Sequence, residues 1–379
     1  MGPLAGIKVL EFESIGPAPF AGMLLADMGA DVLVIDRPAS TDLGLKRERW
    51  YDVMMRGKRS VTLDLKSNTA REAALALAGK ADALIEGMRP GVMERLGVGP
   101  DEALKSNPRL VYGRMTGWGQ DGPLAPRAGH DINYIALAGV LHAFGRKGEA
   151  PVPPLNLIGD FGGGGMLLGF GVACALIEAA RSGRGQVVDA AMVEGAALLA
   201  TMFAGFLKAG SWSEARGDNI LDTGAPWYDV YETKDRKYVS IGSIETRFYE
   251  ELLQKLGVPD LGQHERARWP EMKILFSKTF KTKTREEWCK VFEGSDACFA
   301  PVLSWSEARR DAHNVARKAY VEVAGVEQPA PAPRFSRTPA GVRRSPPERS
   351  EGGRAALADW GFDAKAIDRL RSLGLGAKE

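Results

Sequence analysis

Apolar residues in the first half of the chain fall into short runs separated by stretches with helical spacing. Residues 7–12 and 31–36 are short apolar runs, and residues 17–28 between them have apolar positions at helical spacing before Gly29. This strand–helix–strand order predicts a βαβ unit, and such units build parallel sheets. Further strands are expected at 60–65, 83–86, 110–116 and 186–189, the last one buried, and helices at 69–80, 100–106, from 166 and at 191–208. The predicted fold class is therefore α/β, with a large parallel-sheet, Rossmann-like domain.

The pattern changes after about residue 211. A hairpin is expected at 228–233 and 237–242, followed by helices at 247–256 and 284–292 and a strand at 297–303. We therefore expect a large α/β domain over 1–210 and a smaller α+β domain over 225–310. Residues 320–379 are expected to form a return linker and a C-terminal segment that packs back on the large domain. Composition predicts mobility for 343–354 and a terminal helix over 362–373 with Asp363 as its N-cap.

The first turn of the βαβ unit argues against a dinucleotide cofactor. Residues 14–22 lack the G-x-G-x-x-G pattern, and Pro17 and Pro19 stand where a turn around a pyrophosphate would be. We therefore exclude NAD.

Composition narrows the function classes further. The chain has 379 residues, 45% hydrophobic and 26% charged, and its net charge of +2 is too small to indicate nucleic acid as a partner. The three cysteines and four histidines form no metal-binding spacing, so no metal site is expected, and a reducing, cytoplasmic compartment fits best. Charges interrupt the most apolar region, 166–207, so no membrane span is expected.

Two residues that can transfer protons, His130 and Asp160, lie 30 positions apart among small and apolar residues. Gly162–Gly165 follow Asp160 and lead into the apolar helix expected from Met166, so Asp160 is expected near a helix N-terminus. Such a place suits a carboxylate, a phosphate or a developing oxyanion. The alternative is an ordinary helix N-cap, a role that Asp commonly takes.

Several cations follow successive strands of the expected sheet: Arg37, Lys66, Arg89 and Arg95. Because parallel strands end at one edge of a sheet, these side chains would converge there and could bind a polyphosphate. Solvated surface residues placed by chance are the alternative.

Ten sequence blocks, in one order along the chain, resemble the class III CoA-transferase family (CaiB/BaiF type), and within it the racemases that act on 2-methylacyl-CoA thioesters. The blocks are residues 3–11, 26–38, 64–67, 84–91, 114–120, 129–134, 156–164, 185–191, 224–228 and 242–245. The resemblance implies a homodimer of two interlocked subunits. It also implies an active site between the large domain of one subunit and the small domain of the other.

The resemblance also implies roles for individual residues. His130 and Asp160 match the two acid/base residues of the racemases, and Glu245 matches the carboxylate partner of that histidine. Asp131 is a candidate to assist the histidine. The positions that match CoA contacts are Arg37, Leu63, Asp64, Leu65, Lys66, Gly87, Met88, Arg89, Arg95, Gly129, Asp131, Ile132, Asn133 and Tyr134. Met88 departs from the pattern, because a close relative has an aromatic residue there, so stacking at that position is in doubt.

The expected substrate is an acyl-CoA thioester, and no cofactor is expected because CoA is part of the substrate. The expected reaction inverts the carbon α to the thioester by two-base proton transfer through an enolate. The alternative is CoA transfer with Asp160 as a covalent nucleophile. A third possibility is an inactive acyl-CoA-binding protein.

Overall fold

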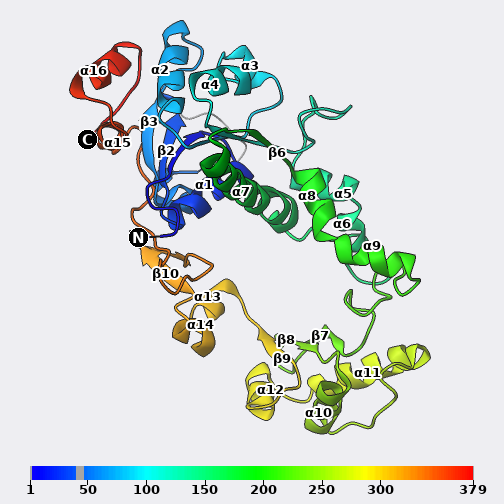
Figure 1. Cartoon of the computed structure of the whole chain (residues 1–379). Helices are drawn as coiled ribbons and strands as arrows, with labels where there is room; N and C mark the ends of the chain where they lie inside the picture. Colours follow the sequence, from blue (N-terminus) through cyan, green and yellow to red (C-terminus); the bar gives the residue numbers. More distant parts are fainter. Residues whose placement is uncertain (1, 40–46, 379) are drawn as a thin grey trace. The chain divides into compact units, whose positions relative to one another are not determined.

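The computed structural model describes residues 2–39 and 47–378 (Figure 1). The chain forms two compact units. Unit 1 comprises Met1–Ala138, Leu155–Leu199 and Lys318–Glu379, and unit 2 comprises Gly139–Pro154 and Ala200–Arg317. The domain bounds given above stay a prediction.

Unit 1 is built on a six-stranded parallel sheet in the order β3-β2-β1-β4-β5-β6, which confirms the predicted α/β class. The order reverses at β1, which lies between β2 and β4, and ligands of open α/β sheets bind at the carboxyl ends of strands beside such a reversal. The strands are β1 (Lys8–Phe12), β2 (Asp31–Asp36), β3 (Arg59–Thr62), β4 (Ala83–Glu86), β5 (Val111–Thr116) and β6 (Val187–Ala191).

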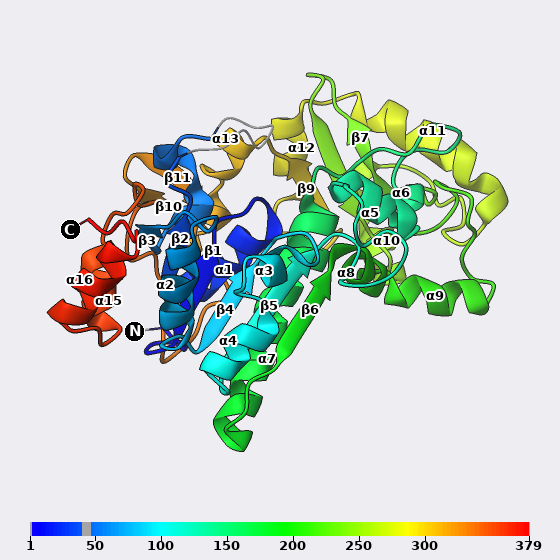
Figure 2. The same cartoon turned by 90° about the horizontal axis from the view of Figure 1, so that it is seen from above.

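Helices cover both faces of this sheet, because successive strand residues point to opposite sides (Figure 2). Leu10 of β1 packs with residues of α2, α4, α15 and α16, whereas its neighbour Val9 packs with residues of α1 and α7. The helices of unit 1 are α1 (Pro17–Asp27), η1 (Arg49–Tyr51), η2 (Val53–Met55), α2 (Asn68–Ala78), α3 (Val92–Arg95), α4 (Pro100–Ser106), α5 (Asp131–Leu137), η3 (Leu157–Met166), α7 (Leu167–Ser182), α8 (Met192–Leu199), α15 (Gly353–Asp359) and α16 (Ala364–Ser372). A hairpin of β10 (Tyr320–Val323) and β11 (Val326–Pro329) completes the unit.

A buried ion pair fastens α1 to the sheet. Lys58 Nζ lies 2.8 Å from Glu11 Oε1 and 2.9 Å from the Pro19 carbonyl oxygen, and both charged side chains are fully buried. Burial raises the pKa of Glu11 to about 7 and lowers the pKa of Lys58. Removing one partner would leave the other as an uncompensated buried charge, which is strongly destabilising.

Within the described residues, one continuous helical stretch, Leu157–Ser182, could cross a bilayer by length and composition, with a mean hydropathy of 1.6. It consists of η3 and α7, and α7 packs on β5 and β6. Core helices of α/β domains meet the same criteria, so the stretch is weak evidence for a membrane span.

Unit 2 contains a three-stranded antiparallel sheet of β7 (Tyr228–Glu232), β8 (Tyr238–Gly242) and β9 (Phe299–Val302), which confirms the predicted hairpin. Its core is aromatic and includes Trp227, Trp288 and Phe280. Its helices are α6 (Val140–Ala143), α9 (Thr201–Lys208), α10 (Thr246–Leu256), η4 (Arg266–Arg268), α11 (Trp269–Phe280), α12 (Arg285–Phe292), α13 (Trp305–Ala308) and α14 (Ala312–Ala316).

Three sequence expectations are wrong in detail. The strand expected to be buried at 186–189 is the edge strand β6, of which only Ala191 is buried. The single helix expected over 191–208 is two helices, α8 and α9, which part at Ala200. Residues 343–354, expected to be mobile, are tied to the sheet by hydrogen bonds from Arg343 to the Ala30 carbonyl and from Arg349 to Glu13.

Candidate active site

Asp160 lies in the first turn of η3, a π-helix that continues into α7. The sequence predicts that a helix begins near Met166. In the structure the helical backbone already begins at Leu157, as a π-helix, a rare conformation that often marks functional sites. Glycine makes the arrangement possible. A Cβ on Gly163 would lie 2.5 Å from the Ala196 nitrogen, and one on Gly165 would lie 2.6 Å from the Pro17 carbonyl oxygen. The glycine run therefore brings the backbone of η3 against α8 and α1.

Asp131 holds the backbone of η3 in place. Its Oδ1 atom accepts the Asp160 N–H at 2.7 Å and also accepts a bond from the Gly159 backbone. The Asp131 side chain is buried, its Oδ2 atom has no hydrogen-bond partner, and burial raises its pKa. The residue immediately after His130 thus positions Asp160.

His130 is the N-cap of α5, and its ring is exposed. The His130 N–H donates to Asn133 Oδ1 at 3.0 Å, which fixes the start of the helix. A positive charge on His130 lowers the pKa of Asp160, so the two groups interact electrostatically within unit 1. The hydrogen bond from Asp160 to Asp131, the neighbour of His130, brings the chain segments of the two predicted acid/base residues together.

Burial decides the protonation of Asp160. It raises the pKa of the carboxyl group and outweighs the hydrogen bond from Asn156 Nδ2 to Asp160 Oδ2 (3.0 Å), which lowers it. The negative charge of Asp131 raises the pKa further. The carboxyl group therefore keeps its proton at higher pH than an ordinary aspartate.

The N-terminus of α1 contributes little to stabilising a negative charge on Asp160. A Cβ on Gly16 would lie 3.1 Å from Asp160 Oδ2, so the carboxyl group faces this helix start. Pro17 and Pro19 have no N–H, which leaves Ala18 as the one N–H donor among the first three helical residues. Few free donors remain to stabilise a carboxylate.

The predicted CoA-contacting residues of unit 1 follow β2, β3 and β4 at the carboxyl edge of the sheet. Arg37 follows β2, and its N–H donates to Glu13 Oε2 at 2.8 Å. After β3, Leu63 and Leu65 are buried or half-buried, while Asp64 and Lys66 are exposed. Parallel pairing places all three strand ends on one edge.

The loop after β4, which carries Arg89 and Arg95, is held by a buried cation. Arg114 Nε donates to Glu86 Oε1 at 2.9 Å, and its Nη1 donates to Glu94 Oε1 at 2.7 Å. Glu86 Oε2 also accepts the Met88 N–H at 2.6 Å, next to Gly87. The exposed side chains of Arg89, in the loop after β4, and Arg95, at the end of α3, thus extend from a backbone that these hydrogen bonds hold in place.

The segment from Gly129 to Tyr134 lies close to this loop. The Tyr134 hydroxyl donates to the Gly129 carbonyl, and burial raises the pKa of Tyr134 to about 12 while the charge of Arg89 opposes that rise. Ile132 is exposed on α5. Glu245 belongs to unit 2, where it is the exposed N-cap of α10.

Four residues of this region were not singled out in the sequence: Glu13, Gly16, Asn156 and Arg349. Asn156 stands four positions before Asp160, a helical spacing that would have predicted the contact once a helix was assumed there. Glu13 and Arg349 lie 336 positions apart, so no local pattern could pair them.

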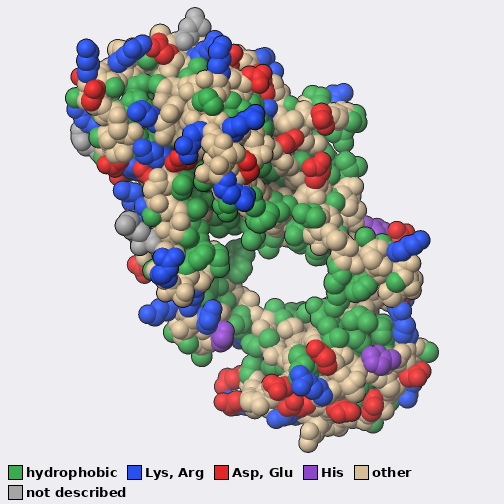
Figure 3. All heavy atoms as spheres, in the orientation of Figure 1, with side chains coloured by type: hydrophobic (Ala, Val, Ile, Leu, Met, Phe, Trp, Pro, Cys, Tyr) green, Lys and Arg blue, Asp and Glu red, His purple; other side chains and the backbone are tan. Residues whose placement is uncertain are grey.

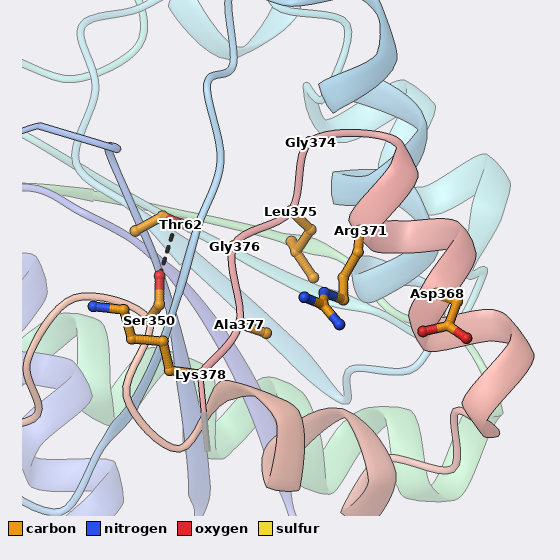
Figure 4. A pocket seen from close by; sticks show the side chains of 9 residues that line it. All are labelled: Thr62, Ser350, Asp368, Arg371, Gly374, Leu375, Gly376, Ala377 and Lys378. Atoms are coloured by element: carbon orange, nitrogen blue, oxygen red, sulfur yellow. Dashed lines mark hydrogen bonds between the residues drawn. The ribbon is translucent and has the colours of Figure 1, made fainter.

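A separate surface cavity of about 730 Å³ lies at the outer edge of the sheet, between β3 and the C-terminal residues (Figure 4). It is lined by Thr62, Ser350, Asp368, Arg371 and residues 374–378. No predicted site residue lines it, although Thr62 directly precedes Leu63.

Comparisons with known proteins agree across the chain. The family described as CoA-transferase family III matches residues 4–352. The α-methylacyl-CoA racemases of Mus musculus and Homo sapiens are 44% and 42% identical, and each alignment covers 97% of this chain and 96% of the relative. A crystal structure of a CaiB/BaiF family protein from Brucella suis has a TM-score of 0.80 at 26% identity and covers 95% of this chain and 99% of that one.

Proposed function

Because the chain belongs to CoA-transferase family III, we propose that it is an α-methylacyl-CoA racemase, an isomerase that interconverts (R)- and (S)-2-methylacyl-CoA. Relatives that carry this name match nearly the whole chain. The observation that carries the proposal is the placement of His130 and a half-buried Asp160, joined through Asp131, in one unit.

The proposed mechanism uses one proton carrier for each face of the α-carbon. His130, as the neutral imidazole, takes the α-proton from one face and leaves an enolate thioester. Asp160, in the protonated form that burial favours by raising its pKa, returns a proton to the opposite face. The reverse reaction starts with the Asp160 carboxylate as base and the His130 imidazolium as acid. The net reaction inverts the carbon and needs no cofactor, since CoA is part of the substrate.

Glu245 is proposed as the carboxylate that orients the His130 ring and stabilises its imidazolium form.

We further propose that the protein acts as a homodimer. The support is a set of large apolar side chains that unit 1 leaves at least half exposed on helical stretches that pack together: Met166, Phe170 and Ile177 of η3 and α7, and Leu198 and Leu199 of α8. Figure 3 shows apolar side chains gathered on the surface that it draws. Groups of exposed apolar side chains mark interaction surfaces.

The dimer proposal can be tested by complementation. Co-expression of His130→Ala and Glu245→Ala chains should yield heterodimers more active than either mutant homodimer, if Glu245 serves His130 across subunits. Equal inactivity of all three dimers would contradict that arrangement.

The CoA moiety is proposed to bind at the carboxyl edge of the sheet, through Arg37, Leu63–Lys66, Gly87–Arg89, Arg95 and Gly129–Tyr134.

We also propose that the protein acts in the cytoplasm. Three free cysteines support a reducing compartment of this kind.

Isotope exchange tests the reaction itself. Both enantiomers of a 2-methylacyl-CoA should exchange the α-hydrogen in D₂O together with racemisation. His130→Ala should abolish exchange from one enantiomer and leave some from the other, and Asp160→Ala should give the opposite pattern. Racemisation should fall in both variants. CoA transfer to a free acid, with a covalent adduct on Asp160 and no α-deuterium, would instead show that the chain is a transferase.

A further inference from the structure

Two consecutive residues near the C-terminus, Arg349 and Ser350, contact the ends of the first three strands. They come from the segment whose composition predicts mobility, and they are about 290 or more positions from their partners. We name this pair the C-terminal clasp.

Arg349 fixes the backbone of Arg37. Its Nη1 atom donates to the Arg37 carbonyl oxygen at 2.6 Å, and its Nη2 atom donates to Glu13 Oε1 at 2.7 Å. Glu13 Oε2 in turn accepts the Arg37 N–H at 2.8 Å. Both polar groups of the Arg37 backbone are therefore held, one by each member of the Arg349–Glu13 ion pair.

Ser350 fixes the end of β3, just before Leu63–Lys66. Its N–H donates to Ser60 Oγ at 2.9 Å, and its hydroxyl lies 2.8 Å from the Thr62 hydroxyl (Figure 4). Ser350 is buried and has a φ of +71°, a conformation that costs free energy in a residue other than glycine. The strained residue Ser350 and its neighbour Arg349 thus connect two segments of the predicted CoA site, Arg37 and Leu63–Lys66.

We propose that the C-terminal clasp is a positioning element for the nucleotide end of acyl-CoA, because it fixes both Arg37 and the start of Leu63–Lys66. The nature of the ligand rests on the proposed function. Arg349 gives its hydrogen bonds to Glu13 and to Arg37, so it acts through Arg37 and is not itself a catalytic residue. If the C-terminal clasp had only a structural role, it would stabilise the fold, and its loss would affect the binding of all parts of the ligand equally.

Substrates with and without the nucleotide separate these two roles. Arg349→Ala should raise the KM for 2-methylacyl-CoA and the Kd for free CoA by about tenfold, because it removes the charge-assisted hydrogen bonds that hold the backbone of Arg37, a predicted CoA contact. The kcat should stay within about twofold of wild type, since remote binding groups serve ground and transition states alike. The KM for the same acyl group on pantetheine, which lacks the nucleotide, should not change.

Two further variants complete the design. Arg369→Ala removes a cation from α16, where it forms an exposed ion pair with Glu72, and should leave both KM values unchanged. Ser350→Ala removes the hydroxyl contact but keeps the strained backbone, and should raise the KM for the CoA thioester alone. Thermal melting of each variant establishes that it is folded.

The proposal is overturned if Arg349→Ala changes neither KM nor Kd, raises the KM of both thioesters equally, or is matched by Arg369→Ala. Failure of the racemase proposal gives a different result. The wild-type chain would then bind CoA without epimerising any 2-methylacyl thioester, and the Kd for CoA alone would decide the role of the clasp.

Discussion

Replacing Asp131 tests how the site holds the half-buried Asp160. The Asp131 carboxylate accepts the N–H groups of Asp160 and Gly159, and hydrogen bonds to a charged group contribute about 1.5–3 kcal/mol each, so Asp131→Ala forfeits about 3–6 kcal/mol. The variant also removes the desolvation cost of the unpartnered Oδ2 atom, about 1–3 kcal/mol. Taken at the middle of each range, about 4.5 and about 2 kcal/mol, the difference leaves a net loss of about 2–3 kcal/mol at the backbone that carries Asp160.

If that loss is expressed as misplacement of Asp160 in the transition state, kcat should fall roughly 30–150-fold. The assay is α-hydrogen exchange in D₂O, measured separately for each enantiomer, with KM and kcat determined for both. Asp131→Asn is the matched variant. Its amide oxygen can still accept the Asp160 N–H, so its kcat should lie between those of the wild type and Asp131→Ala.

Two outcomes would refute this reasoning. A wild-type kcat in Asp131→Ala would show that the hydrogen bond does not position the acid. A higher KM with unchanged kcat would instead identify Asp131 as a contact to the CoA moiety, the role that the family resemblance implies.

Three other predictions concern the same unit. Asn156→Ala removes the hydrogen bond that lowers the pKa of Asp160, so this pKa should rise further. The limb of the pH–rate profile that requires protonated Asp160 should then move to higher pH; an unchanged profile would contradict this. Lys58→Met should destabilise the fold by about 3–5 kcal/mol in chemical denaturation, whereas Glu11→Leu combined with Lys58→Met should recover most of that loss. Equal losses in the single and double variants would show that charge burial is not the cause. Gly163→Ala should lower both activity and melting temperature, because its Cβ would lie 2.5 Å from a backbone nitrogen; wild-type values would rule out this close packing.

The sheet was predictable because each of its strands is a short apolar run with a helical pattern or turn residues beside it. The neighbours Val9 and Leu10 point to opposite faces and are both apolar, so the run also carries the information that both faces of the sheet are covered. The error at β6 shows the limit of that signal: an apolar run cannot tell a central strand from an edge strand, since the strand order depends on the whole topology.

The site was predictable in its residue types but not in its connections. His130 and Asp160 stand out by their chemistry and by the family resemblance. The helix η3 could not be predicted from the sequence, because a glycine run has low helix propensity and forms a helix here only through close packing. Likewise, the composition around Arg349 is typical of a mobile segment, and contacts with residues far away in the sequence order it, among them the Arg349–Glu13 ion pair and the hydrogen bond from Ser350 to Ser60. Long-range contacts of this kind leave no local pattern.

The backbone pairing of Thr62 with Gly376 has a consequence for biosynthesis. Gly376 pairs with Thr62 on the free side of the edge strand β3, and it lies so far along the chain that the ribosome adds it long after that strand. Until then the nascent chain carries an uncovered strand edge, which is a template for pairing with other chains. Truncations that remove Gly376 and the residues after it should therefore increase aggregation during expression far more than their small loss of buried surface suggests.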